Sequence, residues 1–313
     1  MNVVKELDLA IKCHEGGERG TGYTVQDAPT DKALFDAYLT NEAWHAFIKE
    51  MKVQYPKAYT AFCKGGGGEL EEKNGRPPKM ASYGSSSRMI YLLSREHEQD
   101  GFQFEKKLPT TVGGEANLDG CCVELGRRLV FVEAKCHEPY SSKSTEVSVV
   151  YEPLYRYIHE KMPEFSCVME DVTSEKKKGK YKKATFLIHG QALRYFDIKQ
   201  MICHLLGIAT GILNGTLDRE TAKSRIDFLY LLYDPTRLSL PTEAKEQVQT
   251  VWQATCRECR TIDFSRLLRA IFGYLREKES DKVGTLENGE LEQILCGFSF
   301  SLVSQEQYPA CFH

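Results

Sequence analysis

Two neighbouring stretches, Ala116-Asn-Leu-Asp119 and Leu129-Val-Phe-Val-Glu133-Ala-Lys135, decide the fold that the sequence predicts. Each is strand-like, and each carries an acidic residue at or near its end. The segment 120–128 between them predicts a hairpin. Side chains alternate between the faces of a strand, so Glu133 and Lys135 point the same way and Ala134 points into the apolar layer. The carboxylates and the ammonium group therefore converge at one edge of a small sheet.

This combination of groups favours chemistry at a divalent cation. Carboxylates and backbone carbonyls are hard oxygen ligands that suit Mg²⁺ or Mn²⁺. A lysine beside them can orient or deprotonate water, or neutralise charge that develops on a phosphate.

Asp119 and Glu133-Ala134-Lys135 resemble the motif of the PD-(D/E)XK nuclease superfamily, with Ala134 as the X. The chain departs from the motif at Leu118, where the name has proline, but that position does no chemistry. The resemblance implies that Asp119, Glu133 and the carbonyl of Ala134 hold Mg²⁺ or Mn²⁺. It also implies that Lys135 positions or activates the attacking water.

Length and composition describe an ordinary globular protein. The 313 residues can form one large domain or two small ones, and 42% of them are hydrophobic. The formal net charge of −3 argues against a large non-specific DNA footprint, although it leaves room for local basic surfaces.

The cysteine usage predicts free thiols in a reducing cytoplasm. Eleven cysteines are scattered along the chain, no secretory signal opens it, and no apolar run has the length of a membrane span. Cys256 and Cys259 have CxxC spacing, but no second pair accompanies them. We predict structural thiols on one helix face there rather than a metal or redox site.

The remaining pattern predicts the order of elements. The first thirty residues look irregular. A helix is expected from a cap at Thr30-Asp31 through Met51, with an extension over 58–63, and another from Ser85 through Leu93. A strand at 102–108 precedes the two acidic strands. Later elements are expected as helices at 151–161, 191–213, 244–253 and 263–276, a buried strand at 225–233, and an edge strand at 297–303.

One helix, three antiparallel strands, a second helix and a further strand is the core order of the nuclease superfamily, and the resemblance covers roughly residues 85–235. We therefore predict an α/β protein with a restriction-endonuclease-like core, in which helices flank a mixed central sheet. The predicted divisions are an N-terminal helical extension at 1–80, the nuclease-like core at 81–240 and a C-terminal helical region at 241–313 that packs on the core.

Further site candidates come from the predicted helices and strands. Gln191 and Tyr195, four residues apart at the start of the second core helix, match a Gln-x-x-x-Tyr pattern of some superfamily branches, although such pairs also occur by chance. A further acid is sought in Glu105 or Glu69, with Glu105 slightly ahead. Each of these two also fits a plain surface residue. Glu96 and Glu98 are less well placed alternatives.

Several nearby features have simpler interpretations. Gly65 to Gly68 lacks the ending of a phosphate-binding loop, but it could act as a hinge for Glu69. Glu138 could bind a metal-bound water, although solvation of a strand end is favoured, and His137 with Cys136 imitates a zinc site only by coincidence. The run from Lys176 to Lys183 could follow a DNA backbone or form a solvated loop.

The function predicted from these observations is that of a divalent-metal-dependent DNA endonuclease that hydrolyses phosphodiester bonds in the cytoplasm, with restriction or defence as one setting. Its predicted partner is DNA, a homodimer is expected if both strands are cut, and no membrane is involved. The first alternative is a non-catalytic nucleic-acid-binding protein that keeps the fold. The second is a thiol-metal regulatory protein built on Cys256 and Cys259.

Overall fold

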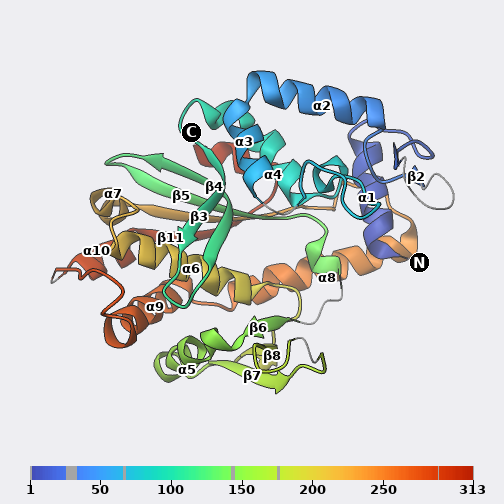
Figure 1. The fold of residues 1–313 in the computed structure, drawn as a ribbon. Helices are drawn as coiled ribbons and strands as arrows, with labels where there is room; N and C mark the ends of the chain where they lie inside the picture. The colour runs from blue at the N-terminus through green and yellow to red at the C-terminus, as the bar shows by residue number, and fades with distance from the viewer. Residues whose placement is uncertain are drawn as a thin grey trace.

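A five-stranded mixed sheet in the order β11-β10-β5-β4-β3 forms the centre of the protein (Figure 1). The computed structural model describes residues 2–25, 34–65, 68–141, 145–174, 177–287 and 289–312. Strands β3 (Gln103–Pro109), β4 (Glu115–Glu124) and β5 (Arg128–Lys135) form an antiparallel meander, and β10 (Ile226–Leu232) and β11 (Phe298–Val303) extend the sheet by parallel pairing. The α/β class and the mixed sheet flanked by helices are therefore confirmed.

Helices cover both faces of this sheet. The face that carries Val130 and Val132 packs against α1 (Val3–His14), α2 (Asn41–Gln54), α3 (Pro56–Lys64) and α4 (Ser86–Ser94). The face that carries Leu129 and Phe131 packs against α6 (Ile198–Leu213) and α9 (Phe264–Lys278). Because β5 and β10 are covered on both sides, their sequences are nearly continuous apolar runs.

Residues near the C-terminus complete these layers. Helix α8 (Thr242–Arg260) contributes Val248 to one core and Cys256 and Cys259 to the other, and it also contacts α1. The shorter helices α7 (Arg219–Ser224) and α10 (Glu290–Gly297) contact each other beside α9. The expected edge strand is confirmed as β11, and α8 and α9 extend beyond the two helices expected there.

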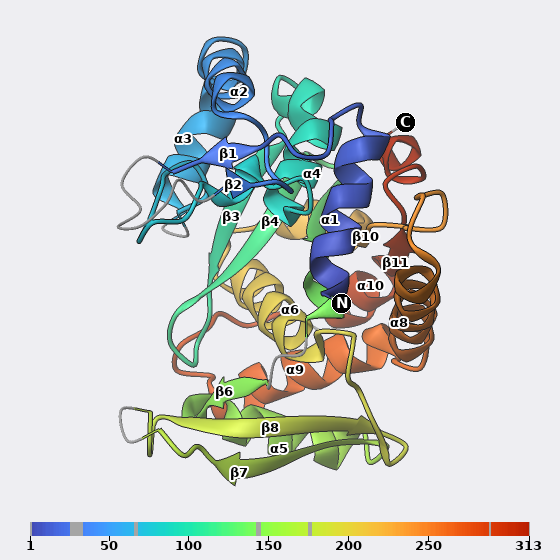
Figure 2. The ribbon, with the colours of Figure 1, turned by 90° about the vertical axis from the view of Figure 1, so that its right-hand side faces the viewer.

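A second sheet, which we call the inserted sheet, lies between β5 and α6 in the chain. It consists of β6 (Glu146–Ser148), β8 (Tyr181–Ile188) and β7 (Phe165–Asp171), with β9 (Gln191–Ala192) paired to β8. Helix α5 (Glu152–Lys161), which was expected, packs on β7 and reaches α9. In Figure 2 this sheet forms a separate layer below α6 and α9.

The predicted helix over 191–213 is wrong in its first seven residues. Gln191 and Ala192 form β9, and α6 begins only at Ile198, where Oδ1 of Asp197 accepts the Gln200 N–H at 3.0 Å. The intervening loop makes its bonds to another helix: Glu258 of α8 accepts the backbone N–H groups of 194, 195 and 196.

The N-terminal predictions also need correction. The first thirty residues are not irregular throughout, because α1 is an amphipathic helix capped by the Asn2 side chain, which accepts the Lys5 N–H at 3.2 Å. The expected cap at Thr30-Asp31 lies outside the described residues. Leu34–Phe35 form β2, which pairs with β1 (Tyr23–Thr24), and the helix starts after Thr40.

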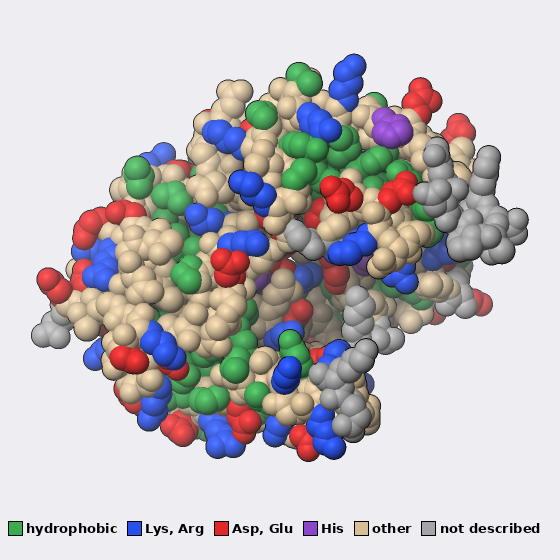
Figure 3. Space-filling view, in the orientation of Figure 1, with side chains coloured by type: hydrophobic (Ala, Val, Ile, Leu, Met, Phe, Trp, Pro, Cys, Tyr) green, Lys and Arg blue, Asp and Glu red, His purple; other side chains and the backbone are tan. Residues whose placement is uncertain are grey.

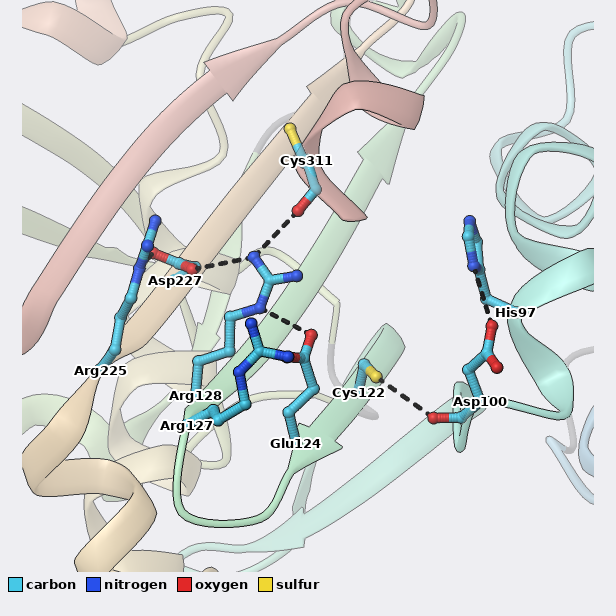
Figure 4. A network of polar contacts seen from close by, with 9 residues as sticks. All are labelled: His97, Asp100, Cys122, Glu124, Arg127, Arg128, Arg225, Asp227 and Cys311. Atoms are coloured by element: carbon cyan, nitrogen blue, oxygen red, sulfur yellow. Dashed lines mark hydrogen bonds and ion pairs between the residues drawn. The ribbon is translucent and has the colours of Figure 1, made fainter. Parts of the chain in front are cut away.

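A charged network closes the end of the sheet at which β5 and β10 begin (Figure 4). Arg128 donates to Glu124 at 2.7 Å and to the Cys311 carbonyl at 3.0 Å, and it lies 3.8 Å from Asp227. Asp227, which is 4% exposed, also accepts from Arg225 at 2.9 Å and from Ser299 at 2.7 Å. This network ties β4, β10, β11 and the C-terminal residues together.

Candidate functional site

The opposite end of β5 carries the residues singled out in the sequence. Glu133 and Lys135 share one face, and the Lys135 Nζ donates to the Glu133 Oε1 at 2.5 Å. Ala134 is fully buried in the core on the other face, but its backbone N–H donates to Asp119 Oδ2 at 2.7 Å. Asp119, Glu133 and Lys135 therefore lie together at one edge of the sheet.

The strands separate where these groups meet. Pairing between β4 and β5 ends at Gly120 and Val132, so Asp119 reaches β5 through its side chain instead of its backbone. The Lys135 carbonyl accepts the Tyr233 N–H at 2.9 Å. Successive peptide groups of a central strand point to opposite neighbours, so the Ala134 carbonyl points toward β4 and Asp119.

Glu105 lies across from Asp119 in the register of β3 and β4. Phe104 pairs with Gly120 and Lys106 with Leu118, while Glu105 itself has the left-handed value φ = 51°. This conformation is rare for a residue with a Cβ and marks a local constraint. It lets β3 exchange its faces, since Phe104 packs in one core and Leu108 in the other.

The Glu105 side chain turns toward the site as a result. Its Oε2 accepts a hydrogen bond from Asn117 Nδ2 at 2.9 Å. Burial raises its pKa, and the carboxylates of Glu69 and Glu133 add to the increase. Glu105 therefore belongs to the same electrostatic cluster as the two predicted metal ligands.

The pKa values of the central groups move in different directions. Burial raises the pKa of Asp119 well above its ordinary value, and repulsion from Glu133 raises it further. Burial also acts against the Glu133 charge, but the attraction of Lys135 and His204 prevails and lowers its pKa. Burial opposes the Lys135 ammonium in the same way, yet the carboxylates around it, Glu133 foremost, raise its pKa well above the usual value.

Lys135 is not the solvent-facing lysine that a strand end suggests. Its side chain is 10% exposed, and that of Glu133 is 2% exposed. The helices on this face and the inserted sheet shield the end of β5, so this pair is part of the interior.

Two residues of α6 complete the network, and the sequence analysis missed both. Gln200 Oε1 accepts from Lys135 Nζ at 2.7 Å, and His204 Nε2 lies 2.8 Å from Glu133 Oε2. The signal was present as two polar residues four positions apart in an otherwise apolar helix, which puts both on one face. The predicted pair, Gln191 and Tyr195, lies before the start of α6 at Ile198.

The other candidates have different surroundings. Gln191 is exposed on β9, opposite Ile188, and takes no part in this network. Glu96 accepts from the Tyr55 hydroxyl at 2.6 Å, and Glu98 accepts the Ala58 N–H at 2.8 Å at the start of α3. Glu69 pairs with Lys79 at 3.1 Å. Two more candidates have local partners: Glu138 accepts the Cys136 N–H at 2.7 Å, and His137 contacts Asp8 at 2.9 Å.

A cleft of about 340 Å³ opens beside Lys135. Its wall on the core side includes Gln200 and Tyr230, the loop before α6 contributes Tyr195, and the inserted sheet contributes Glu146 and Phe186. Figure 3 shows the molecule hollowed between its larger upper part and the lower part that contains the inserted sheet, with charged and His side chains visible inside. A ligand in this cleft touches both sheets.

The lysine run and the CxxC pair lie apart from this network. Lys176 is outside the described residues, Lys177 pairs with Glu146 at 2.5 Å, and Lys182 and Lys183 belong to β8. Cys256 and Cys259 are buried in one core, as structural thiols on one helix face would be.

The strand gap offers oxygen ligands of the kind that hard divalent cations prefer. Asp119 and Glu133 provide carboxylates, the Ala134 carbonyl points between the strands, and Glu105 lies beside them. Asp119 and Glu133 are both buried, and the pKa of Asp119 is raised. Burying two carboxylates in their charged form destabilises the fold unless a cation offsets their charge. Among the described residues, no group of three or more His, Cys, Asp and Glu side chains is arranged to hold a metal, so these side chains alone do not form a metal site here.

Comparisons with protein-family models, with curated proteins and with solved structures found no significant match. Within the described part of the chain, no helix is long and apolar enough to cross a membrane.

Proposed function

We propose that this protein is a divalent-metal-dependent DNA endonuclease with a restriction-endonuclease-like core. The observation that carries the proposal is the convergence of Asp119, Glu133 and Lys135 where β4 and β5 separate. The order of α4, the three-stranded meander, α6 and β10 supports it, since this is the order expected of such a core. The inserted sheet is an addition within that core.

Asp119, Glu133 and the Ala134 carbonyl would hold Mg²⁺ or Mn²⁺, with Glu105 available as a further acid. When bound, the cation would polarise the scissile phosphate and stabilise the leaving oxygen. The protein holds these oxygens in place before substrate arrives: Ala134 fixes Asp119, and His204 fixes Glu133.

Lys135 acts in its protonated form. Its raised pKa keeps the ammonium charged at neutral pH, so it serves as a hydrogen-bond donor to water or to a phosphate oxygen and not as the base. Gln200 and Glu133 each accept a hydrogen bond from Nζ of Lys135, and together they set the direction of its third N–H. Gln200 is therefore a positioning residue.

DNA is proposed as the substrate because a phosphodiester is the ligand that suits these acids and this lysine together. Arg194 and Lys199 border the cleft and can contact the backbone of a bound strand. Cutting both strands of a duplex needs two such sites, which is the reason to propose a homodimer.

A metal-dependent cleavage assay on linear, branched and methylated DNA tests the proposal. Wild type should cleave with Mg²⁺ or Mn²⁺, and Asp119→Asn should not. Glu124→Gln is the matched control, because it removes an acid of the same strand at the other end of the sheet. Absence of cleavage of all three substrates with both metals would contradict the proposal.

One observation favours the alternative of a non-catalytic DNA-binding protein. Both Glu133 oxygens already accept hydrogen bonds, from Lys135 and from His204, so a cation must share or displace these donors. DNA binding that survives in Asp119→Asn and Lys135→Ala, without cleavage by wild type, would support this alternative.

A further inference from the structure

Tyr230 of β10 has a buried hydroxyl group without a protein partner. The residue is 1% exposed, and its hydroxyl makes no hydrogen bond with the described residues. Buried tyrosine hydroxyls usually have a partner, because an unpaired buried polar group destabilises the fold. Such a hydroxyl is available to a ligand where its side chain also lines a cavity.

The position of this hydroxyl is fixed by packing. The Tyr230 ring lies 4.9 Å from that of Phe196 and 6.4 Å from that of Phe300, measured between centroids. Tyr230 is paired in register with Glu133 of β5, and paired residues of neighbouring strands share a face. The ring therefore cannot turn its hydroxyl away from the site without disturbing the core.

Tyr230 also lines the cleft, together with Lys135 and Gln200. The charges of Lys135, Asp197 and Glu133 all act on its hydroxyl. Glu133 is held by Lys135 and His204, and Asp197 is engaged in capping α6, so these acids already have donors of their own. The Lys135 ammonium remains the positive group next to the open hydroxyl.

The chemistry of the hydroxyl selects an anionic acceptor. A tyrosine hydroxyl is protonated at neutral pH, so it can donate a hydrogen bond. A neutral donor and an ammonium side by side match two oxygens of one phosphate group.

We propose that Tyr230 is a substrate-binding residue that donates a hydrogen bond to a phosphodiester oxygen of a DNA strand seated in the cleft beside Lys135. This inference rests on the proposed function for the identity of the substrate. It adds a residue of β10 to the site. It also places the substrate between the core and the inserted sheet.

Tyr230→Phe is the test, because it removes one oxygen and keeps the ring. Tyr140→Phe is the matched control: the Tyr140 hydroxyl is also buried without a described partner, but its side chain packs in the core on the other face of the sheet. Each variant is melted without ligand. Binding of a short fluorescein-labelled DNA, single-stranded and duplex, is then measured by anisotropy in Ca²⁺, and cleavage is measured in Mg²⁺.

The expected result separates a ligand role from a structural one. Tyr230→Phe should melt at or above the wild-type temperature and bind one or both DNA forms about 10- to 100-fold more weakly, as expected for a lost hydrogen bond to a charged group. Tyr140→Phe should match wild type in binding and cleavage. Wild-type affinity in Tyr230→Phe, a lower melting temperature of that variant, or an equal loss in Tyr140→Phe would each overturn the inference.

The assay also separates this inference from the proposed function. Wild type that binds DNA through Tyr230 but cleaves none would leave the inference standing and remove the nuclease function. Wild type that cleaves DNA, with a Tyr230→Phe variant that binds and cleaves equally well, would do the reverse.

Discussion

Two charged clusters lie at the two ends of β5 and β10. They differ in how completely their polar groups find hydrogen-bond partners within the protein. At the end where the strands begin, Arg128 and Arg225 flank Asp227, and Arg128 also donates to Glu124 (Figure 4). Ser299 donates to Asp227 as well. At the other end, the Tyr230 hydroxyl and Nδ1 of His204 are buried without a described partner. At that end, burial and the repulsion from Glu133 raise the pKa of Asp119.

We interpret this difference as one between a structural cluster and a candidate functional one. Both clusters contain buried acids, both contain cations, and both join neighbouring strands, so charge alone does not separate them. The first is satisfied by protein groups, whereas the second leaves donors and acceptors open and carries perturbed pKa values, as sites that bind ligands do. The following variants test that contrast, from the largest expected effect to the smallest.

Lys135→Met should have the largest effect. It keeps the apolar stem and removes the ammonium, so cleavage should fall by roughly 10²- to 10³-fold, as for the loss of one preorganised donor at a transition state. Single-turnover cleavage, with folding checked by circular dichroism, measures this. Because the pair with Glu133 is buried, some loss of stability is also expected, and a rate within twofold of wild type would show that the lysine is structural.

Asp119→Asn should change both stability and its response to metal. The folded-state pKa of Asp119 lies above the unfolded value of about 4, so metal-free wild type loses free energy of unfolding as pH rises from the unfolded pKa to the folded one, by about 1.4 kcal/mol for each pH unit that separates them. The variant lacks this loss and should be as stable as wild type or more so at pH 8.

Added Mg²⁺ should reverse that order, because it stabilises wild type by about 2.7 kcal/mol at a concentration one hundred times the Kd and gives the variant little. Thermal melts across pH, with and without Mg²⁺, test both parts. A wild type that gains nothing from Mg²⁺ or Mn²⁺ at millimolar concentration contradicts the metal site.

Asp227→Ala, at the opposite end, should affect stability alone. It removes the acceptor shared by Arg225 and Ser299, which should lower the free energy of unfolding by about 2 kcal/mol. The cleavage rate per folded molecule should equal that of wild type. Urea denaturation and cleavage by the same preparation give the two values, and a selective loss of cleavage would erase the distinction between the two ends.

Gln200→Leu should have a smaller effect than Lys135→Met. The ammonium stays, but it loses one of the acceptors that orient it, so kcat should fall about tenfold, the equivalent of about 1.4 kcal/mol, with KM little changed. Gln200→Glu keeps an acceptor and should retain more activity than Gln200→Leu. Equal activity of the two variants would show that Gln200 does not position Lys135.

Arg127→Ala should have the smallest effect. Its side chain is 81% exposed and lies 3.3 Å from Glu124, and exposed ion pairs of this kind contribute little. A change below about 0.5 kcal/mol in stability and no change in cleavage are expected. A larger change would mean that the network in Figure 4 depends on the exposed ion pair between Arg127 and Glu124.

The central strands could be predicted because their residue patterns indicate directly which side chains are buried. The run in β10 is apolar at every position except Asp227, as a strand covered on both faces must be, and Gly126 marks the turn between β4 and β5. The shared face of Glu133 and Lys135 follows from strand alternation alone. These features depend only on residues close in sequence.

The contacts made from α6 could not be predicted in this way. His204 lies 71 positions from Glu133, and Gln200 lies 65 positions from Lys135, so only the folded chain brings them together. The start of α6 was misplaced for a related reason. The residues before Asp197 continue an apolar pattern, and their bonds to Glu258, more than sixty positions away, are invisible to propensity.

The inserted sheet was missed because its strands are short or only half-covered. β7 has only one buried residue, Phe165, and β8 has buried residues only from Ala184 onward. The lysine-rich segment between them has the composition of a solvated loop. The left-handed conformation of Glu105 was also unforeseen, because no turn-forming residue marks it. It is imposed by the exchange of faces in β3, which is a tertiary property.

The bonds of Glu258 have a consequence for how this protein can be divided. This one carboxylate on α8 gathers three consecutive peptide groups of the loop that walls the cleft. A gene fragment that encodes only residues 81–240 would keep Asp119, Glu133 and Lys135, yet it would lack the anchor of that loop and the strand beside β10. Recombination or truncation at that boundary would transfer the motif without the shape of the cleft, so the smallest fragment that keeps the whole proposed site extends through α8 and β11.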